Sequence, residues 1–530
     1  MALTDDDVIE ILRLIDEAED EELEVEAGTF TLYVRREPGQ APAPSARREP
    51  GGEDVVDVVD TTMRDGNQSL WSATGLTTPD VLSIAPTVDR VGFHAADFSS
   101  STHMAVSVRF HQEDPWERIR LVSAAMPNTP LSFITTGMRF ISWVPADEDV
   151  IRLSFRCVVR NGIRRFQIAD PTNDPARLRR LARMAREEGV EEVVVGLTYS
   201  VSEVHTHEYY AERAAALAGC PDLDRLYLKD PGGLLTPDAV RELAPHFLAA
   251  AGDRPVELHS HCTIGLAPFV YMEGLRAGFQ VLHTAVEPLA RGTSNPAAET
   301  TLRNLEAEGF SHRLDLDALA AMSEHFRRLG VEKGLPAGAP QEYDATYYHH
   351  QLAGGMVSTT KRMLDEQRRP ELFEAVLEEV GRVRAEMGYP IIVTPVSQFV
   401  ATQAVRNVID GERWQNVPDE IIRYFLGHYG EPAAPVDPDV SDRVLARSRT
   451  DALRDLEPLH LERERFRAGI SDEELLLRLT MPEEQVDAMI VARGTRSPSR
   501  TLLREVARRE SVSHLRVQTR ERTLEWRREA

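Results

Sequence analysis

The chain alternates short apolar segments with amphipathic helical segments eight times, and this repetition constrains its fold more than any other feature. The apolar segments are rich in β-branched residues, which is typical of buried strands. They lie at residues 55–62, 91–98, 131–137, 164–170, 191–199, 225–230, 255–262 and 281–289. Eight strand-helix units in succession predict an α/β fold with a closed (β/α)8 barrel, whose catalytic residues lie at the C-terminal strand ends. A doubly wound open sheet competes, but no glycine-rich GxGxxG turn follows the first strand.

Changes in composition divide the chain into five parts. A stretch rich in Pro, Ala and Gly lacks apolar periodicity and predicts a linker. After the barrel, helical periodicity replaces the strands and predicts a mostly helical C-terminal domain. The predicted parts are a docking unit at 1–37, a linker at 38–54, a barrel at 55–335, a helical domain at 336–499 and a terminal unit at 500–530.

The two ends of the chain resemble each other. Residues 8–37 and 500–529 align without a gap as a helical segment, an alternating strand and a TLxxRRE-like end. Each predicts one helix packed on a hairpin, a unit too small to bury a core alone. We expect the two units to pair with one another or to dock a partner; convergence of two short amphipathic patterns is the alternative.

Composition excludes several classes of function. The formal net charge of -25 disfavours general binding to nucleic acid or anionic lipid. Three widely spaced cysteines form no disulfide framework and no paired zinc motif. The N-terminus lacks the charged and apolar regions of a signal peptide, and no long apolar run is present, so we expect a cytoplasmic protein without membrane insertion.

Two histidines mark the end of the seventh predicted strand. His259 and His261 are two residues apart, so both side chains point to the same face of a strand. That geometry suits a divalent metal such as zinc, manganese or cobalt. Taken alone, such a pair is more often two hydrogen-bonded histidines.

The first predicted strand brings further polar groups to the same end of the barrel. It runs into DTTMRDGNQ, which supplies carboxylate, guanidinium and amide groups from Asp60 to Gln68. By itself, an Asp-rich strand end is commonly a helix cap or a turn. Together with the two histidines, it predicts a metal-dependent site.

Lys229 ends the sixth predicted strand, next to the strand with the histidines. Of 61 basic residues only Lys229, Lys333 and Lys361 are lysines. Because a charged ammonium would be repelled at a metal site, Lys229 must be neutralised there, and a neutral amine can react with carbon dioxide to give a carboxylate-like carbamate. The alternative, a simple ion pair with Asp230, would be served equally by arginine.

Several motifs, in order, resemble those of the biotin-dependent carboxyltransferases. This family includes the oxaloacetate decarboxylase α subunit, the carboxyltransferase domain of pyruvate carboxylase and the keto-acid subunit of transcarboxylase. The resemblance extends over roughly residues 55 to 480. It is carried by DTTMRDGNQSL (60–70), EDPWERIR (113–120), AMPNTPL (125–131), LKDPGGLLTP (228–237), HSHCTIG (259–265), GTSNPAAET (292–300), AGGMVSTT (353–360) and TPVSQFVATQAVRNVIDGERW (394–414).

The resemblance implies a metal centre and a reaction. The family's metal ligands fall on Asp65, a carbamylated Lys229, His259 and His261. The implied reaction moves a carboxyl group between carboxybiotin, supplied by a separate carrier chain, and an enolisable acceptor. Pyruvate or oxaloacetate is the default acceptor, and another keto acid or acyl compound is the alternative.

Other positions carry the family's substrate contacts and proton transfer. Arg64 and Gln68 match the positions that hold the keto acid, and Thr293 matches the residue that shuttles a proton. The loop after the third strand departs from the family pattern. Thr136 stands where an arginine that binds the substrate carboxylate is expected, and Trp143 stands where a tyrosine is expected. Arg139, three residues from the usual register, is a candidate replacement.

The biotin must come from another chain. Neither Lys333 nor Lys361 is flanked by methionines on a hairpin, as a biotinylated lysine is. The unit at 1–37 resembles the segment that begins biotin carboxyl carrier proteins. The resemblance therefore implies a multi-subunit complex with biotin carboxyl carrier and biotin carboxylase subunits, and at least a homodimer of this chain.

Two other functions share part of this pattern. The DTTxRDGxQ and HxH elements also occur in metallolyases such as hydroxymethylglutaryl-CoA lyase, which perform Claisen or retro-aldol chemistry without a ligand lysine. Activity that survives Lys229→Arg would favour such a lyase. A non-catalytic scaffold of a carboxylase complex is the second alternative, and it predicts little bound metal.

Overall fold

The computed structural model describes most of the chain. The described residues are 22–27, 30–36, 55–142, 144–352, 354–455, 457–467, 469–495, 512–518 and 523–527. The predicted linker at 38–54 lies outside them.

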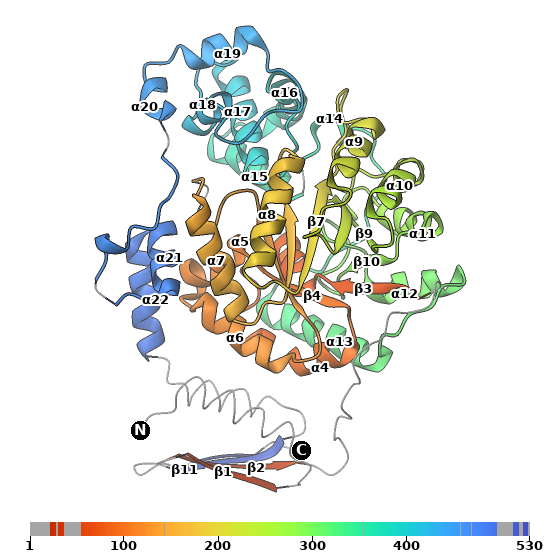
Figure 1. Ribbon diagram of the computed structural model, residues 1–530, viewed down its shortest axis with the longest axis vertical. Helices are drawn as coiled ribbons and strands as arrows, with labels where there is room; N and C mark the ends of the chain where they lie inside the picture. Colours follow the sequence, from red (N-terminus) through yellow and green to blue (C-terminus); the bar gives the residue numbers. More distant parts are fainter. Residues whose placement is uncertain are drawn as a thin grey trace.

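Eight parallel strands close into a barrel in chain order, with β10 hydrogen-bonded to β3 (Figure 1). This confirms the predicted (β/α)8 architecture, and all eight predicted strands form. The strands are β3 (Asp57–Asp60), β4 (Ala95–Ser100), β5 (Leu131–Thr136), β6 (Arg165–Ala169), β7 (Glu192–Thr198), β8 (Arg225–Asp230), β9 (Val256–Ser260) and β10 (Val281–Thr284).

Helices surround the barrel, and the longer ones bury an apolar stripe against it. In α8, Leu178, Leu181, Ala182 and Ala185 are buried at helical spacing, and the carboxylate of Asp174 caps the helix. These helices are η1 (Thr62–Gly66), α2 (Asn67–Trp71), α3 (Thr78–Leu82), α4 (Ala85–Val91), α5 (Ser101–Val106), η2 (Ser107–His111), α6 (Pro115–Ala125), α7 (Glu148–Arg160), α8 (Pro175–Glu187), α9 (His207–Leu217), α10 (Pro237–Ala251), α11 (Ala267–Ala277), α12 (Ala298–Ala307) and α13 (Leu316–Lys333).

The helices that follow have a hydrophobic core of their own, with buried residues from Leu352 to Val444. They follow α14 (Tyr347–His350), whose Tyr347 belongs to the barrel core, and are α15 (Gly354–Glu366), η3 (Pro370–Leu372), α16 (Phe373–Glu386), α17 (Val396–Asp410), α18 (Asp419–Phe425), α19 (Pro438–Leu445) and α20 (Thr450–Arg454). After η4 (Arg463–Arg465), α21 (Asp472–Thr480) and α22 (Glu483–Thr495) instead add buried residues such as Leu476 and Met489 to the barrel core. Figure 1 shows them beside α7.

The helical domain lies over the C-terminal ends of the barrel strands. The side chains of Gln351 and Arg384 donate hydrogen bonds to the carbonyl of Val201, which follows β7, over 2.7 and 2.9 Å. The Tyr347 hydroxyl donates to the carbonyl of Gly232, which follows β8, over 2.8 Å. Helices of the C-terminal domain therefore lie over the mouth of the barrel at β7 and β8.

The two ends of the chain meet in one sheet. Its order is β1 (Glu22–Ala27), β2 (Phe30–Arg36), β11 (Val512–Gln518) and β12 (Thr523–Arg527), with β2 antiparallel to β11. Of the two arrangements expected for the terminal units, the structure therefore has their strands paired with one another. The helices predicted in both units lie outside the described residues. No helix among the described residues has the length and apolarity to cross a membrane.

A buried ionic network fills the barrel near its N-terminal end. The guanidinium of Arg165 contacts both carboxylate oxygens of Glu257 at 2.6 Å and one of Glu192 at 2.7 Å. Arg165 and Glu257 are completely buried. Burial would raise the pKa of Glu257, but Arg165 and His283 hold it well below its ordinary value, so the pair remains charged.

Substitution of Arg165 by methionine removes the guanidinium that contacts both Glu257 and Glu192, and leaves Arg225 as the remaining arginine of the network. We expect Arg165→Met to lower the free energy of unfolding by about 3–5 kcal/mol, as measured by urea denaturation. The matched control is Arg152→Met, which removes the exposed ion pair with Glu187 on the outer helices and is expected to cost less than about 1 kcal/mol. Equal effects of the two substitutions would contradict this account.

Candidate metal centre

Three ligand atoms converge at the C-terminal end of the barrel. Asp65 lies in η1, directly after β3, while His259 lies in β9 and His261 follows it. The Nε2 atoms of the two histidines are 3.1 Å apart, and each is 3.2 Å from Oδ2 of Asp65. All three side chains are buried. The structure thus brings together three of the four predicted ligands.

The spacing of these atoms fits a divalent cation. A tetrahedral site with bonds of about 2.0–2.1 Å separates neighbouring ligand atoms by about 3.3 Å. Burial lowers the pKa of His259 well below its ordinary value, which keeps its imidazole neutral. Burial would raise the pKa of Asp65, but Arg64 and His261 hold it well below its ordinary value. One carboxylate and two neutral imidazoles form a donor set that zinc, manganese or cobalt accepts.

Lys229 ends β8 in register with His259 on β9. Its side chain is buried, and its charge disfavours protonation of His259. Burial, reinforced by Arg64, lowers the pKa of Lys229 to about 8. A larger fraction of the amine is therefore neutral near pH 7 than in an exposed lysine, which is the form that reacts with carbon dioxide.

Arg64 is fixed by two carboxylates. Its Nε donates to Asp97 on β4 over 2.7 Å, and its Nη1 lies 3.1 Å from Oδ1 of Asp65. Asp65 therefore uses one oxygen for the arginine and the other for the histidines. The sequence did not point to Asp97, because its role depends on the neighbouring positions of β3 and β4 in the barrel.

Thr293 contributes two separate groups. Its backbone carbonyl accepts a hydrogen bond from Nδ1 of His261 over 2.6 Å, which leaves Nε2 of that ring free to face Asp65. Its hydroxyl donates to the carbonyl of Ser69 over 3.0 Å. The backbone of Thr293 orients a candidate ligand, and its side chain is half-buried beside the site.

The predicted substrate residues lie at the same end of the barrel. Gln68 is half-buried in α2, and Thr136 ends β5. The guanidinium of Arg139 lies 4.6 Å from the ring centre of Tyr429 in the helical domain, and burial lowers its pKa. Tyr429 lines a cavity of about 280 Å³ between the barrel and the helical domain. Trp143 lies outside the described residues.

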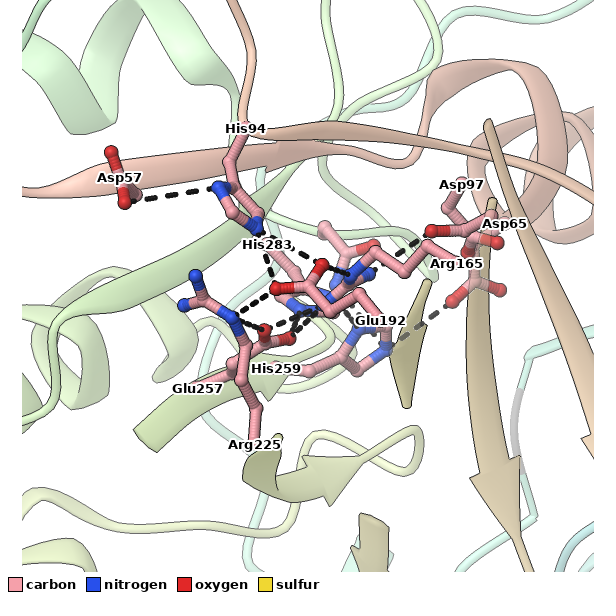
Figure 2. Close-up of polar contacts among 12 residues, drawn as sticks. Asp57, Asp65, His94, Asp97, Arg165, Glu192, Arg225, Glu257, His259 and His283 are labelled. Carbon is pink, nitrogen blue, oxygen red and sulfur yellow. Dashed lines mark hydrogen bonds and ion pairs between the residues drawn. The ribbon is translucent and has the colours of Figure 1, made fainter. Parts of the chain in front are cut away.

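A chain of polar contacts runs from the centre into the barrel (Figure 2). Nδ1 of His259 lies 3.2 Å from Nδ1 of His283 on β10, and Nε2 of His283 lies 2.8 Å from Glu257. Glu257 leads to Arg165 and then to Glu192. Sequence patterns alone did not single out His283 or Glu257. The available signals were that Glu257 lies two residues before His259 on β9 and that His283 lies on the neighbouring β10, but only the stagger of the strands decides which residues meet.

Comparisons with known protein families agree with the two large domains. Residues 55–325 match the HMGL-like family, and residues 347–516 match the conserved carboxylase domain. The chain is 37% identical over 394 residues to a pyruvate carboxylase subunit of Methanocaldococcus jannaschii, covering 74% of this chain and 68% of that protein. It is 31% identical over 389 residues to the 2-oxoglutarate carboxylase large subunit of Hydrogenobacter thermophilus, covering 73% and 59%.

Solved structures share the fold. The carboxyl transferase domain of Rhizobium etli pyruvate carboxylase, solved with 3-bromopyruvate, superposes with a TM-score of 0.77 at 23% sequence identity. The match covers 90% of this chain and 84% of that one. The barrel and its helical domain are therefore arranged as in that structure.

Metal binding can be tested directly. We expect the metal-stripped protein to bind one equivalent of Co²⁺ and His261→Ala to lose at least about tenfold in affinity, because the cation loses one ligand of a small set. Titration with a competing chromophoric chelator measures the affinity. His94→Ala is the matched control, since His94 contacts Glu192 at the far end of the polar chain. A similar loss in both variants would argue against the centre.

Proposed function

Since this chain belongs to the biotin-dependent carboxyltransferases, we propose that it transfers a carboxyl group between carboxybiotin on a separate carrier chain and an enolisable keto acid. The observation that carries the proposal is the convergence of Asp65, His259 and His261 at the mouth of a carboxyltransferase-like barrel. Lys229, beside His259 in the register of β8 and β9, is proposed as the fourth ligand.

Carbamylation of Lys229 is proposed to supply the fourth ligand as a carboxylate. The neutral amine nitrogen forms a bond to the carbon of carbon dioxide and releases one proton, which leaves an N-carboxylate with one negative charge. The lowered pKa of the amine and its burial beside Asp65 support this step. With zinc, manganese or cobalt bound, these four residues would hold a Lewis acid that stabilises negative charge on the carbonyl oxygen of the acceptor.

Arg64, Gln68 and Thr293 are proposed to act on the acceptor. Arg64 is held rigidly by Asp65 and Asp97, so its charge is oriented before the acceptor binds. Gln68 lies about one helical turn further along the chain and offers an amide. The Thr293 hydroxyl takes the proton from the methyl carbon of the acceptor and passes it to N1 of biotin, while the carboxyl group moves from N1 to that carbon. The reverse sequence decarboxylates the product.

The default acceptor is pyruvate, with oxaloacetate in the reverse direction, and another keto acid is the alternative. Thr136 cannot make the bidentate contact that an arginine makes with a carboxylate. Arg139 is proposed to bind the acceptor carboxylate in its place. Its guanidinium lies 4.6 Å from the ring centre of Tyr429, and Tyr429 lines the cavity between the two domains, which supports this assignment.

The carrier is proposed to be a separate subunit. Lys333 contacts Asp80 and the carbonyl of Gly75, and Lys361 lies 4.7 Å from the ring centre of Phe373. Lys333 ends α13 and Lys361 lies within α15, so neither lies on a hairpin such as the one that carries a biotinylated lysine. The relative from M. jannaschii is named as a subunit, which supports assembly with carrier and carboxylase subunits. We propose that the terminal sheet docks one of them.

A substitution of Thr293 tests its proposed role in proton transfer separately from metal binding. We expect Thr293→Ala to lower carboxyl transfer by about 10²–10⁴-fold, because the shuttling hydroxyl is removed. Its affinity for Co²⁺ is expected to match that of the wild type, since the backbone carbonyl still orients His261. Transfer from carboxybiotin to a panel of keto acids measures the rate. Thr293→Ser, which keeps the hydroxyl, is the control, and an alanine variant as fast as wild type would refute the role.

The docking role of the terminal sheet can be tested with a proline in its second strand. Val34 pairs with Leu23 on β1 and with Leu515 on β11, and proline cannot donate a hydrogen bond within a central strand. We expect Val34→Pro to lose co-purification with at least one of the carrier and carboxylase subunits while Co²⁺ binding in the barrel remains. Capture of both subunits by this variant at the wild-type level would exclude the terminal sheet as the docking site.

A further inference from the structure

The imidazole of His283 connects a candidate metal ligand to a buried carboxylate. Its Nδ1 lies 3.2 Å from Nδ1 of His259, and its Nε2 lies 2.8 Å from Oε2 of Glu257 (Figure 2). All three side chains are completely buried. The ring of Tyr227 stacks on His283 with the centres 5.6 Å apart and the planes 9° from parallel. The position of His283 is thus set by packing and by contacts at both of its nitrogens.

The positions of the protons along this chain follow from the carboxylate. Arg165 donates to both oxygens of Glu257 and keeps it ionised, so Glu257 can only accept. Glu257 and Glu192 are already paired with the guanidinium groups of Arg165 and Arg225, so the network has no unpaired carboxylate to stabilise an imidazolium, and a neutral His283 carries one N–H. His283 therefore donates from Nε2 to Glu257 and presents a bare Nδ1 to His259.

His259 then has one favourable tautomer. Its Nδ1 must carry the proton and donate it to His283, because two bare nitrogens 3.2 Å apart would repel each other. Its Nε2 is left without a proton and faces Oδ2 of Asp65 and Nε2 of His261. His261 reaches the same state by donating from Nδ1 to the carbonyl of Thr293.

We propose that His283 is a positioning residue for the metal centre, which holds His259 in the tautomer whose Nε2 lone pair faces the cation. This inference rests on the metal centre in the proposed function. Metal-ligating histidines usually donate their second N–H to a carboxylate, a backbone carbonyl or water. In this protein the neutral imidazole of His283 accepts that hydrogen bond from His259. The carboxylate of Glu257 does not contact His259 directly but accepts a hydrogen bond from His283.

The ionic network gives this arrangement its rigidity. Glu257 cannot turn away from His283 without leaving the guanidinium of Arg165, which also holds Glu192 from β7. The tautomer of His259 on β9 thus depends on charges placed by β6 and β7. This is a role for the buried network beyond stability.

Metal affinity of the full-length, metal-stripped protein tests the proposal. We expect His283→Phe, which keeps a ring but cannot accept a hydrogen bond, to lower Co²⁺ affinity by about 10–100-fold. His283→Asn should retain most of the affinity, because its amide oxygen can take the place of Nδ1. Tyr227→Phe is the matched control; it keeps the ring stacked on His283 and removes a hydroxyl that has no hydrogen-bond partner among the described residues. It should bind as wild type does.

A second measurement reads the tautomer of His259 in the wild type itself. In the metal-stripped wild type, ¹⁵N NMR of labelled histidines, with His259 assigned from the spectrum of His259→Gln, should show a proton on Nδ1 and none on Nε2. A proton on Nε2 would overturn the proposal, as would a folded His283→Phe that binds Co²⁺ as tightly as wild type or an asparagine variant as weak as phenylalanine. Wild type that binds no Co²⁺ would instead refute the metal centre itself.

Discussion

The convergence of three hydrogen-bond acceptors on one point is the constraint on which the site depends. Nε2 of His259, Nε2 of His261 and Oδ2 of Asp65 lie 3.1–3.2 Å from one another inside the protein. With both imidazoles protonated on Nδ1, no hydrogen lies between these atoms, and their mutual repulsion is uncompensated. A cation relieves that repulsion, so the same geometry that is costly without a metal favours binding one.

The neighbouring groups maintain this arrangement from three directions. Arg64 contacts the second oxygen of Asp65, the carbonyl of Thr293 accepts a hydrogen bond from His261, and Nδ1 of His283 accepts one from His259. The chain ends in the buried network around Arg165, which is also expected to matter for stability. The charges of Arg165, Glu257 and Glu192 are therefore expected both to stabilise the barrel and to orient the ligands of its metal centre.

Much of the fold could be predicted from the chain, because periodicity and strand-end position are local properties. Eight β-branched segments between amphipathic helices predict a barrel, and in any barrel the residues after β3 and at the ends of β8 and β9 share one mouth. The side chains of His259 and His261 had to share a face because they are two residues apart in a strand. Lys229 stood out because this chain otherwise uses arginine almost throughout.

Other features depend on contacts between segments far apart in the chain. The stagger between β9 and β10 brings His283 to His259, and the adjacency of β3 and β4 brings Asp97 to Arg64. The docking of α21 and α22 on the barrel core, and the pairing of β2 with β11, join segments that local patterns cannot orient. The sequence alone determined the barrel and pointed to Asp65, His259 and His261 as candidate ligands, since periodicity and residue type are local. Only the tertiary structure decided which nitrogen of each histidine faces the cation site, because that depends on hydrogen-bond partners from other strands.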